Sequence, residues 1–232
     1  MKNRVSVLFI GNSYTYYNEM PEVIFAKMAQ EAGYDITVEK VTKGGARLVR
    51  YLDPSDEYGE KVFSLLCEPK RFDYVVLQEQ SLLPASDEAD VFFNAVREHV
   101  KKIRSVDASP ILYATWGRKT GSPNLLELGL TNETMTNKLA EAYQSMGDEL
   151  CVPVAHVGRA FYDVYTSDSE IELYYEDKSH PSYAGSYLAA ATIFAKIFGE
   201  RPAFVADETR LSEADANILT DTAMKINNIE IK

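Results

Sequence analysis

Short apolar runs alternate along the chain with longer segments in which apolar residues recur at helical spacing. The short runs cover residues 5–10, 36–41, 74–77, 111–116 and 152–157. The segments between them that have helical spacing cover residues 21–32, 58–66, 89–103 and 132–150. Strand-length runs that alternate with amphipathic helices predict an α/β protein with a five-stranded parallel sheet. Helices would cover both faces of this sheet through right-handed crossovers.

The last third of the chain contains mostly helical patterns. After the fifth expected strand come a short helical stretch at 160–165, a polar loop at 167–170, a helix at 181–198 and a final helix at 212–226. No internal repeat, low-complexity tract or linker rich in Pro, Gly or Ser divides the sequence. We therefore expect residues 1–232 to form one domain, with ligands bound beyond the carboxyl ends of the strands.

The composition agrees with a soluble domain that buries a full core. Of the 232 residues, 46% are hydrophobic and 25% are charged, which excludes a fibrous or disordered chain. The two cysteines, Cys67 and Cys151, are too few for a disulfide framework and have no second cysteine or histidine at zinc-finger spacing. We interpret both as buried thiols.

The charge of the chain argues against nucleic acid and membrane partners. A formal net charge of -11 would repel a phosphate backbone or an anionic membrane surface, and no stripe of Lys and Arg offsets it. The longest apolar runs, such as residues 5–10, are too short to span a bilayer, and this first run has the length of a strand rather than of a signal peptide. We expect a cytoplasmic protein that acts on a small molecule, and the sequence does not predict its oligomeric state.

A serine follows the first predicted strand. The segment Gly-Asn-Ser-Tyr-Thr begins at Gly11, so Ser13 would lie at the carboxyl edge of the sheet, on a turn where a glycine permits tight backbone geometry. This position suits a catalytic nucleophile. A serine in a strand-to-helix turn is also a common helix cap, and this segment alone leaves both roles open for Ser13.

An acid and a base lie close together near the other end of the chain. Asp177 precedes His180 by three residues, and Pro181 would open the following helix and leave the His180 ring free at its entrance. Asp177 could then accept a hydrogen bond from one imidazole nitrogen while the other faces a hydroxyl, as in a catalytic triad. Alone, His180 would more often be a helix cap and Asp177 a loop carboxylate, so it is their pairing that favours catalysis.

The other two histidines suit this role less well. His99 falls in a charged helical segment and is expected to be solvated, and His156 falls in the fifth expected strand as a packed core or edge residue. Only His180 combines a nearby carboxylate with a loop. The sequence therefore predicts a triad of Ser13, His180 and Asp177.

These motifs resemble those of the SGNH hydrolases, the esterase superfamily also called GDSL-type. Members of that family carry a serine in a Gly-Asp-Ser-like motif after the first strand and a late Asp-x-x-His motif. Residues 11–13 match the first motif with Asn12 in place of Asp, and residues 177–180 match the second in full. The resemblance covers the whole chain. It implies a three-layer α/β/α flavodoxin-like fold and the hydrolysis of carboxylic esters by Ser13.

The resemblance also implies an oxyanion hole with three donors. In the family these are the backbone N–H of the nucleophile, here Ser13, a glycine N–H after the second strand, and an Asn side chain after the third. In the Lys-Gly-Gly-Ala segment after the second strand, Gly45 is the favoured donor and Gly44 the alternative. After the third strand the usual Gly-x-Asn-Asp is absent, and the register points to Gln80, with Gln78 as the alternative. A Gln amide carries the same N–H donors as Asn on a longer stem.

Aromatic and basic residues surround the same edge of the sheet. The candidate substrate-binding residues are Trp116, Gln78 and Tyr14. Rings at a pocket rim can stack on sugars or cover an acyl chain, although most aromatic residues simply pack. Arg47 and Arg118 lie near this edge too, where they could meet an anionic substrate or remain solvated surface groups.

The sequence thus predicts a serine esterase that forms an acyl-enzyme and requires no metal or organic cofactor. The resemblance implies carboxylic esters as substrates, with short acyl groups on carbohydrates ahead of lipid esters and thioesters. No extended apolar lid is evident in the sequence, which favours small acyl groups. The alternative is a catalytically inactive sugar- or ligand-binding module on the same fold, since a fold alone does not determine function. The turn after the first strand lacks a glycine-rich phosphate loop, which disfavours a nucleotide ligand.

Overall fold

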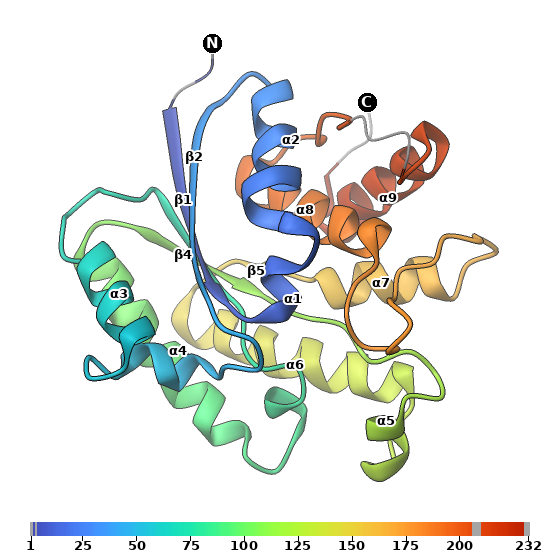
Figure 1. Ribbon diagram of the computed structural model, residues 1–232, viewed down its shortest axis with the longest axis horizontal. Helices are drawn as coiled ribbons and strands as arrows, with labels where there is room; N and C mark the ends of the chain where they lie inside the picture. Colours follow the sequence, from blue (N-terminus) through green and yellow to red (C-terminus); the bar gives the residue numbers. More distant parts are fainter. Residues whose placement is uncertain (1, 3, 206–209, 230–232) are drawn as a thin grey trace.

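Five parallel strands form one sheet between two layers of helices in the computed structural model, which describes residue 2 and residues 4–205 and 210–229 (Figure 1). The strands are β1 (Arg4–Gly11), β2 (Asp35–Thr42), β3 (Tyr74–Leu77), β4 (Ser109–Tyr113) and β5 (Val154–Ala155). Their spatial order is β2-β1-β3-β4-β5, and every pairing is parallel. The predicted α/β/α class and flavodoxin-like order are confirmed. The strand order reverses between β1 and β3, where such sheets bind their ligands.

Side chains of β1 alternate between the two faces of the sheet. Val7 and Phe9 enter an apolar cluster on one face, whereas Leu8 and Ile10 enter a cluster on the other. All four side chains are fully buried. This burial on both faces is the physical origin of the continuous apolar run at residues 5–10.

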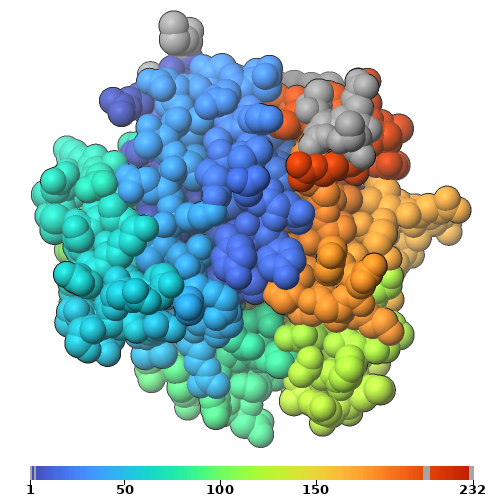
Figure 2. Space-filling view, viewed as in Figure 1, coloured from blue at the N-terminus to red at the C-terminus, as the bar shows by residue number. Residues whose placement is uncertain are grey.

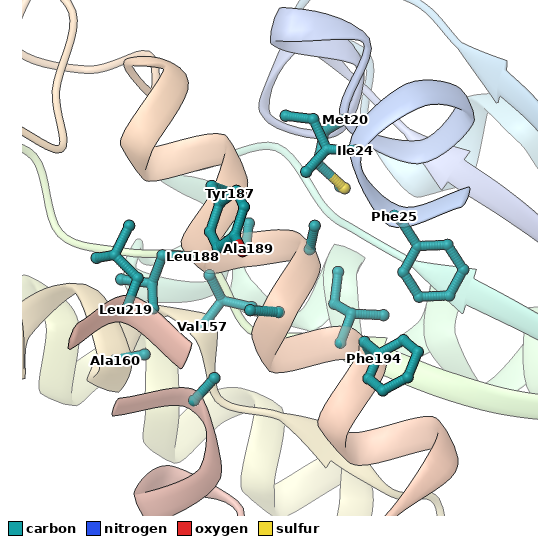
Figure 3. Close-up of a cluster of buried hydrophobic side chains, with 14 of the residues drawn as sticks. Met20, Ile24, Phe25, Val157, Ala160, Tyr187, Leu188, Ala189, Phe194 and Leu219 are labelled. Carbon is teal, nitrogen blue, oxygen red and sulfur yellow. The ribbon is translucent and has the colours of Figure 1, made fainter. Parts of the chain in front are cut away.

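The helix α8 is the centre of one covering layer. This layer contains α2 (Ala26–Glu31), α7 (Val157–Tyr165), α8 (Tyr183–Phe198) and α9 (Glu213–Ile226). Residues 184–195 of α8 are all buried, because neighbouring elements supply side chains such as Phe25, Val157 and Leu219 around it (Figure 3). Within the residues described, no helix is both long and apolar enough to cross a membrane.

The other layer covers the opposite face of the sheet. It contains α3 (Glu57–Leu65), α4 (Ala89–Ser105) and α6 (Asn132–Leu150). On α4 the buried residues Phe92, Val96, Val100 and Ile103 recur at spacings of three and four, which places them on one face of the helix. The Phe92 ring packs against Tyr143 of α6, with ring centroids 4.7 Å apart.

The connection from β1 to β2 differs in detail from the predicted helix at residues 21–32. It begins with α1 (Ser13–Tyr16) and η1 (Tyr17–Glu19). A π-helix, η2 (Met20–Phe25), then continues into α2. Pro21 lies in the first turn of η2, where its missing N–H has no intrahelical partner to lose.

The helix expected at 181–198 begins two residues later, at Tyr183. Ser182 is its N-cap, and the Ser182 hydroxyl accepts the N–H of Gly185 at 3.1 Å. Pro181 instead forms an isolated antiparallel bridge with Tyr174. The prediction that Pro181 opens the helix is therefore wrong, because a serine oxygen next to it satisfies a helical N–H that proline cannot.

Short helical elements shape the loops at the carboxyl edge of the sheet. Those that the sequence pattern does not reveal include η3 (Leu48–Leu52), η4 (Leu83–Ala85) and α5 (Pro123–Glu127). Each has five residues or fewer. Such a length is too short to display a helical period.

Both cysteines are exposed, which corrects the prediction that they are buried. Cys67 lies just after the end of α3, and Cys151 is the C-cap of α6 with φ 51. A residue at a helix terminus projects beyond the apolar face that the helix buries. The preference of free thiols for the interior is only statistical and does not decide either position.

The two other histidines also differ from expectation. His99 is fully buried on the inner face of α4, not solvated, and its Nε2 lies 2.9 Å from the carbonyl oxygen of Leu48. His156 is the N-cap residue of α7 and not part of a strand, and its Nε2 lies 2.7 Å from Oε1 of Gln144. Burial lowers the pKa of each imidazole to about 4. Both are therefore neutral at neutral pH.

Candidate active site

Ser13 and His180 meet at the carboxyl edge of the sheet. Ser13 opens α1 directly after β1, and Asp177 and His180 lie in the loop before α8. The Ser13 Oγ is 2.8 Å from Nε2 of His180. On the other side of the ring, Nδ1 is hydrogen-bonded to Oδ2 of Asp177. Figure 2 shows the blue N-terminal segment and the orange C-terminal segment side by side on the surface.

A tight turn holds Asp177 against His180. The Asp177 Oδ1 accepts the backbone N–H groups of Ser179 at 3.0 Å and His180 at 2.9 Å. Burial opposes ionisation of this carboxyl, but the hydrogen bonds from His180 and Ser179 outweigh it and keep its pKa below the usual value. Because Oδ2 accepts from the ring, Nδ1 carries the proton, and Nε2 is left to accept from the Ser13 hydroxyl.

Asn12, rather than Ser13, caps the helix that follows β1. Its Oδ1 accepts the N–H of Tyr14 at 3.1 Å, and its Nδ2 donates to the carbonyl of Ala46 at 3.0 Å. The helix-cap alternative for Ser13 does not apply, since its hydroxyl points to His180 instead. In the sequence, Asn12 is noticeable only because it replaces the Asp of the family motif, and its role as a helix cap cannot be seen there. The amide can donate to a carbonyl, which a carboxylate cannot do.

Gln78 lies beneath the nucleophile turn instead of in the substrate pocket. It is 1% exposed, and its Oε1 accepts the N–H of Asn12 and the hydroxyl of Thr15, both at 2.8 Å. A Cβ on Gly11 would lie 2.6 Å from this oxygen. Glycine is therefore needed at position 11 because Gln78 approaches so closely. Gln78 does not line the cavity over Ser13, so the prediction that it binds substrate is corrected: it supports the turn that carries Ser13.

A series of rings supports the histidine. Tyr17 stacks on the His180 imidazole with centroids 4.3 Å apart, and Tyr14 meets the same ring edge-on at 5.6 Å. Tyr14 in turn stacks on Trp116 at 4.5 Å. Trp116 is fully buried, and its Nε1 donates to the carbonyl of Ser179 at 3.0 Å. The predicted contact between Trp116 and substrate is corrected, because the ring lies behind the site. The sequence pattern did not single out Tyr17.

A cavity of ≈ 440 Å³ opens over the Ser13 hydroxyl. Its lining residues are Asn12, Ser13, Tyr14, Gly45, Gln80, Ser81, Arg118, Pro123, Asn124, Asp177, Ser179 and His180. Tyr14 belongs to this wall, although it is 3% exposed and its hydroxyl lies 2.7 Å from Oγ of Ser179. The volume is in the range of small-molecule sites.

Gly45 and Gln80 bring hydrogen-bond donors to the same cavity. Gly45 has φ 69, a left-handed conformation that favours glycine. The Oε1 of Gln80 accepts two backbone N–H groups of the following turn at 2.9 and 3.0 Å, which orients its amide. Within the described part of the chain, no acceptor engages the Gln80 Nε2 or the N–H groups of Ser13 and Gly45. Gly44, the alternative donor, does not line the cavity.

Two buried titratable groups hold the loop that carries Gly45. Glu79 is fully buried, and its Oε1 accepts the N–H of Gln80 at 2.6 Å and the N–H of Leu48 at 3.0 Å. His99 binds the carbonyl of the same Leu48. Burial raises the pKa of Glu79 to about 7, although its hydrogen bonds act in the opposite direction. One carboxyl group thus joins the loops after β2 and β3.

A second cavity of ≈ 680 Å³ adjoins the first and shares Gly45 and Gln80 with it. Its other lining residues include four leucines, Leu82, Leu83, Leu128 and Leu130. Arg47 also lines it and pairs with Glu88 at 2.8 Å. In the part of the chain that is described, no group of three or more His, Cys, Asp or Glu side chains could hold a metal ion.

Solved structures match this chain over most of its length. A protein from Slackia heliotrinireducens assigned to the SGNH hydrolases is 30% identical; the match covers 83% of this chain and 98% of that chain with a TM-score of 0.71. A DUF4886 family protein from Bacteroides uniformis is 16% identical, with 99% and 97% covered and a TM-score of 0.78. A catalytic mutant of an acetylxylan esterase from Geobacillus stearothermophilus is 16% identical, with 87% and 97% covered and a TM-score of 0.63. The last two likenesses show the fold alone. No family model and no curated protein matches the chain.

Proposed function

The chain belongs to the SGNH hydrolase superfamily, and from that premise we propose that it is a serine esterase that cleaves carboxylic esters through an acyl-enzyme. The observation that carries the proposal is the hydrogen-bonded order of Ser13, His180 and Asp177 at one edge of the sheet. A serine hydroxyl alone is a weak nucleophile. An adjacent imidazole that a carboxylate orients is the arrangement that activates it.

The first half of the proposed reaction transfers the acyl group to the enzyme. The Ser13 Oγ attacks the ester carbonyl while Nε2 of His180 takes its proton, and Asp177 stays ionised beside the imidazolium. The N–H groups of Ser13 and Gly45 and the Nε2 of Gln80 donate to the oxyanion that forms. His180 then returns the proton to the alcohol oxygen as the C–O bond to the leaving group breaks.

The second half releases the acid. A water molecule gives a proton to His180 and attacks the acyl carbonyl, and the same donors stabilise the second oxyanion. The bond from the carbonyl to the Ser13 Oγ then breaks, and His180 returns the proton to that oxygen. This sequence of steps requires no metal or organic cofactor.

We further propose short acyl groups on carbohydrates as the substrates. The fold is similar to that of acetylxylan esterases, which supports this class. The cavity of ≈ 440 Å³ over Ser13 is suited to a small acyl group. The adjoining cavity of ≈ 680 Å³ offers space for a larger alcohol portion.

Comparison of the wild type with Ser13→Ala tests the proposal. Nitrophenyl esters of acetate, butyrate and a long-chain acid report on acyl size, and we expect acetate to be cleaved fastest. Ser13→Ala should lower kcat by about 10,000-fold or more. An organophosphonate probe should add its mass once to the wild type and not to Ser13→Ala. Release of acetate from acetylated xylo-oligosaccharides tests the carbohydrate assignment.

A matched variant, Ser105→Ala, controls for the loss of a hydroxyl. Ser105 is exposed at the end of α4, where its Oγ donates to the carbonyl of Lys102. It should keep both activity and labelling. If Ser13→Ala cleaves esters at the wild-type rate, the nucleophile assignment is wrong. If the wild type neither cleaves esters nor reacts with the probe, the inactive binding module replaces the esterase.

A further inference from the structure

Arg118 brings a positive charge to the wall of the catalytic cavity. It lies in the loop between β4 and α5 and lines the cavity together with Ser13 and His180. No lysine and no other arginine is among the described residues of this lining. A guanidinium beside the nucleophile favours a ligand with a complementary negative charge.

The Arg118 guanidinium has few partners of its own. Its Nη2 donates to Oγ of Ser81 at 3.2 Å. Its Nε is buried, yet it has no hydrogen-bond partner in the described part of the chain, and no described carboxylate pairs with the group. A buried N–H of a charged group without an acceptor is costly. The Nη1 group also has no hydrogen-bond partner in the described part of the chain and is not buried, so it can donate to a ligand oxygen.

Other cations at this edge of the sheet are already engaged. Arg47 forms an ion pair with Glu88 at 2.8 Å. Lys119, the neighbour of Arg118 in sequence, forms one with Glu172. These pairs neutralise their own charges, whereas the charge on Arg118 remains available to a ligand.

The backbone of Arg118 is held in a fixed position. Its carbonyl accepts Nδ2 of Asn132 at 2.9 Å, and the same Nδ2 lies 3.0 Å from the carbonyl of Gly117. Asn132 is buried at the start of α6. A Cβ on Gly117 would lie 2.4 Å from the carbonyl oxygen of Asn132, so the loop packs tightly against this helix. A side chain on such a fixed loop is positioned before the ligand arrives.

We propose that Arg118 forms an anion subsite and that the esters cleaved at this site carry a carboxylate near the scissile bond. The inference rests on the proposed esterase function and names the substrate class of that site. The end of the guanidinium that contains Nη1 and Nη2 can donate to the two oxygens of a carboxylate. Ser81 and Asn124 lie in the same wall and offer additional polar groups.

Pairs of esters that differ only in charge test the subsite. The acetate ester of para-hydroxybenzoate is compared with that of para-hydroxybenzamide, which places the anion on the alcohol side. Monoethyl succinate is compared with ethyl succinamate, which places it on the acyl side. We expect the wild type to prefer the anionic member of at least one pair by about tenfold or more in kcat/KM, since hydrogen bonds to charged groups are worth that much.

Variants at position 118 assign the preference to the guanidinium. Arg118→Met should abolish it, mainly through KM, while the neutral ester changes by less than about threefold. Arg118→Lys should keep part of the preference, because an ammonium retains the charge but not the bidentate geometry. Lys27→Met removes an equal charge at an exposed residue of α2 that lines neither cavity, and it should leave the preference intact.

Binding to Ser13→Ala separates the subsite from the chemistry. Para-hydroxybenzoate tests the alcohol side and monoethyl succinate the acyl side. At least one of the two should bind this variant in a calorimeter and should not bind Ser13→Ala combined with Arg118→Met. That result supports the subsite even if the wild type cleaves no ester, in which case only the proposed function fails. Equal rates on both members of each pair, or a preference that survives Arg118→Met, would overturn the subsite and leave the esterase in place. If the wild type cleaves no ester and no anionic ligand binds in a way that depends on Arg118, the proposed subsite is wrong.

Discussion

The two halves of the candidate site are held in place by different interactions. In the triad half, Asp177 and His180 lie three residues apart, one turn supplies their contacts, and their side chains remain 43% and 25% exposed. In the oxyanion half, Gly45 and Gln80 belong to separate loops that are joined through the fully buried Glu79. A local motif therefore builds the pair proposed for the triad, whereas tertiary burial positions the residues proposed as oxyanion donors.

This contrast determines what a substitution in each half should change. Few buried groups depend on the exposed triad side chains, so their loss should remove chemistry and leave the fold intact. The residues beneath the oxyanion loops satisfy buried backbone groups, and their loss leaves those groups without partners. Variants in that half should therefore change stability and its pH dependence as well as activity.

Asp177→Asn should have the largest effect and should act on chemistry alone. We expect kcat to fall about 10,000-fold, because the amide favours the wrong imidazole tautomer. Thermal melting should change little, and kcat on nitrophenyl acetate measures the loss. Glu176→Gln removes the neighbouring exposed carboxylate and should stay within about threefold of wild type. An Asp177→Asn enzyme that turns over at nearly the wild-type rate would remove Asp177 from the triad.

The larger elements of the fold could be predicted because burial leaves a periodic trace in the sequence. β1 is buried on both faces and appears as an unbroken apolar run, and α4 repeats apolar residues at spacings of three and four. η4 and α5 have three and five residues, which is too few to show a helical period in the sequence. The burial of His99 could not be predicted from its immediate neighbours in sequence. Its neighbours in sequence are charged, yet its spacing from Val96 and Ile103 places it on the inner face.

The site could be predicted where its residues are neighbours in sequence. Asp177 and His180 form a local pair, and the resemblance to a known family supplies Ser13 as their partner. The choice between Gln78 and Gln80 is different, because both follow the same strand. Buried contacts beyond the end of the strand separate the two residues, with the Gln78 amide tied to Asn12 and the Gln80 side chain lining the cavity, and they favour Gln80 as the proposed donor. Those contacts join loops that are distant in sequence.

Gln80→Glu should have the next largest effect and tests the oxyanion half directly. The substitution keeps an oxygen for the two N–H groups that Gln80 now binds, but it replaces the Nε2 donor with a second oxygen. We expect kcat to fall about 100- to 1,000-fold, with the stability changed by less than about 1 kcal/mol. Gln30→Glu makes the same chemical change at an exposed position of α2 and should have no effect on kcat. Unchanged turnover in Gln80→Glu would exclude Gln80 as a donor.

Glu79→Gln should change how stability depends on pH. Because the folded-state pKa of Glu79 is about 7, above its usual 4.5, the folded protein keeps a proton that the unfolded chain releases. The stability from Glu79 is therefore fully present below pH 4.5 and is lost as the pH rises through 7. An amide releases no proton. The unfolding free energy of the variant minus that of the wild type should therefore rise by about 3 kcal/mol from pH 4.5 to pH 8.

Urea unfolding of wild type and Glu79→Gln at both pH values measures this shift. The difference between the two proteins at each pH cancels other titrating groups. His99 is one of these, because its lowered pKa of about 4 removes stability as the pH falls below 6.5, which is the opposite trend. A difference in unfolding free energy that stays constant with pH would contradict the raised pKa of Glu79.

The smallest effect is expected from Gln78→Met, which decides between the two glutamines. Loss of the Gln78 Oε1 leaves the buried N–H of Asn12 without its acceptor and should cost about 1–3 kcal/mol of unfolding free energy. The Gln78 Nε2 donates to the Glu79 carbonyl and not to the cavity, so kcat should fall by less than about tenfold. Suppose instead that Gln78→Met loses turnover at unchanged stability while Gln80→Glu remains active. The oxyanion donor would then be Gln78, and the buried residue would belong to the chemistry rather than to the support of the nucleophile turn.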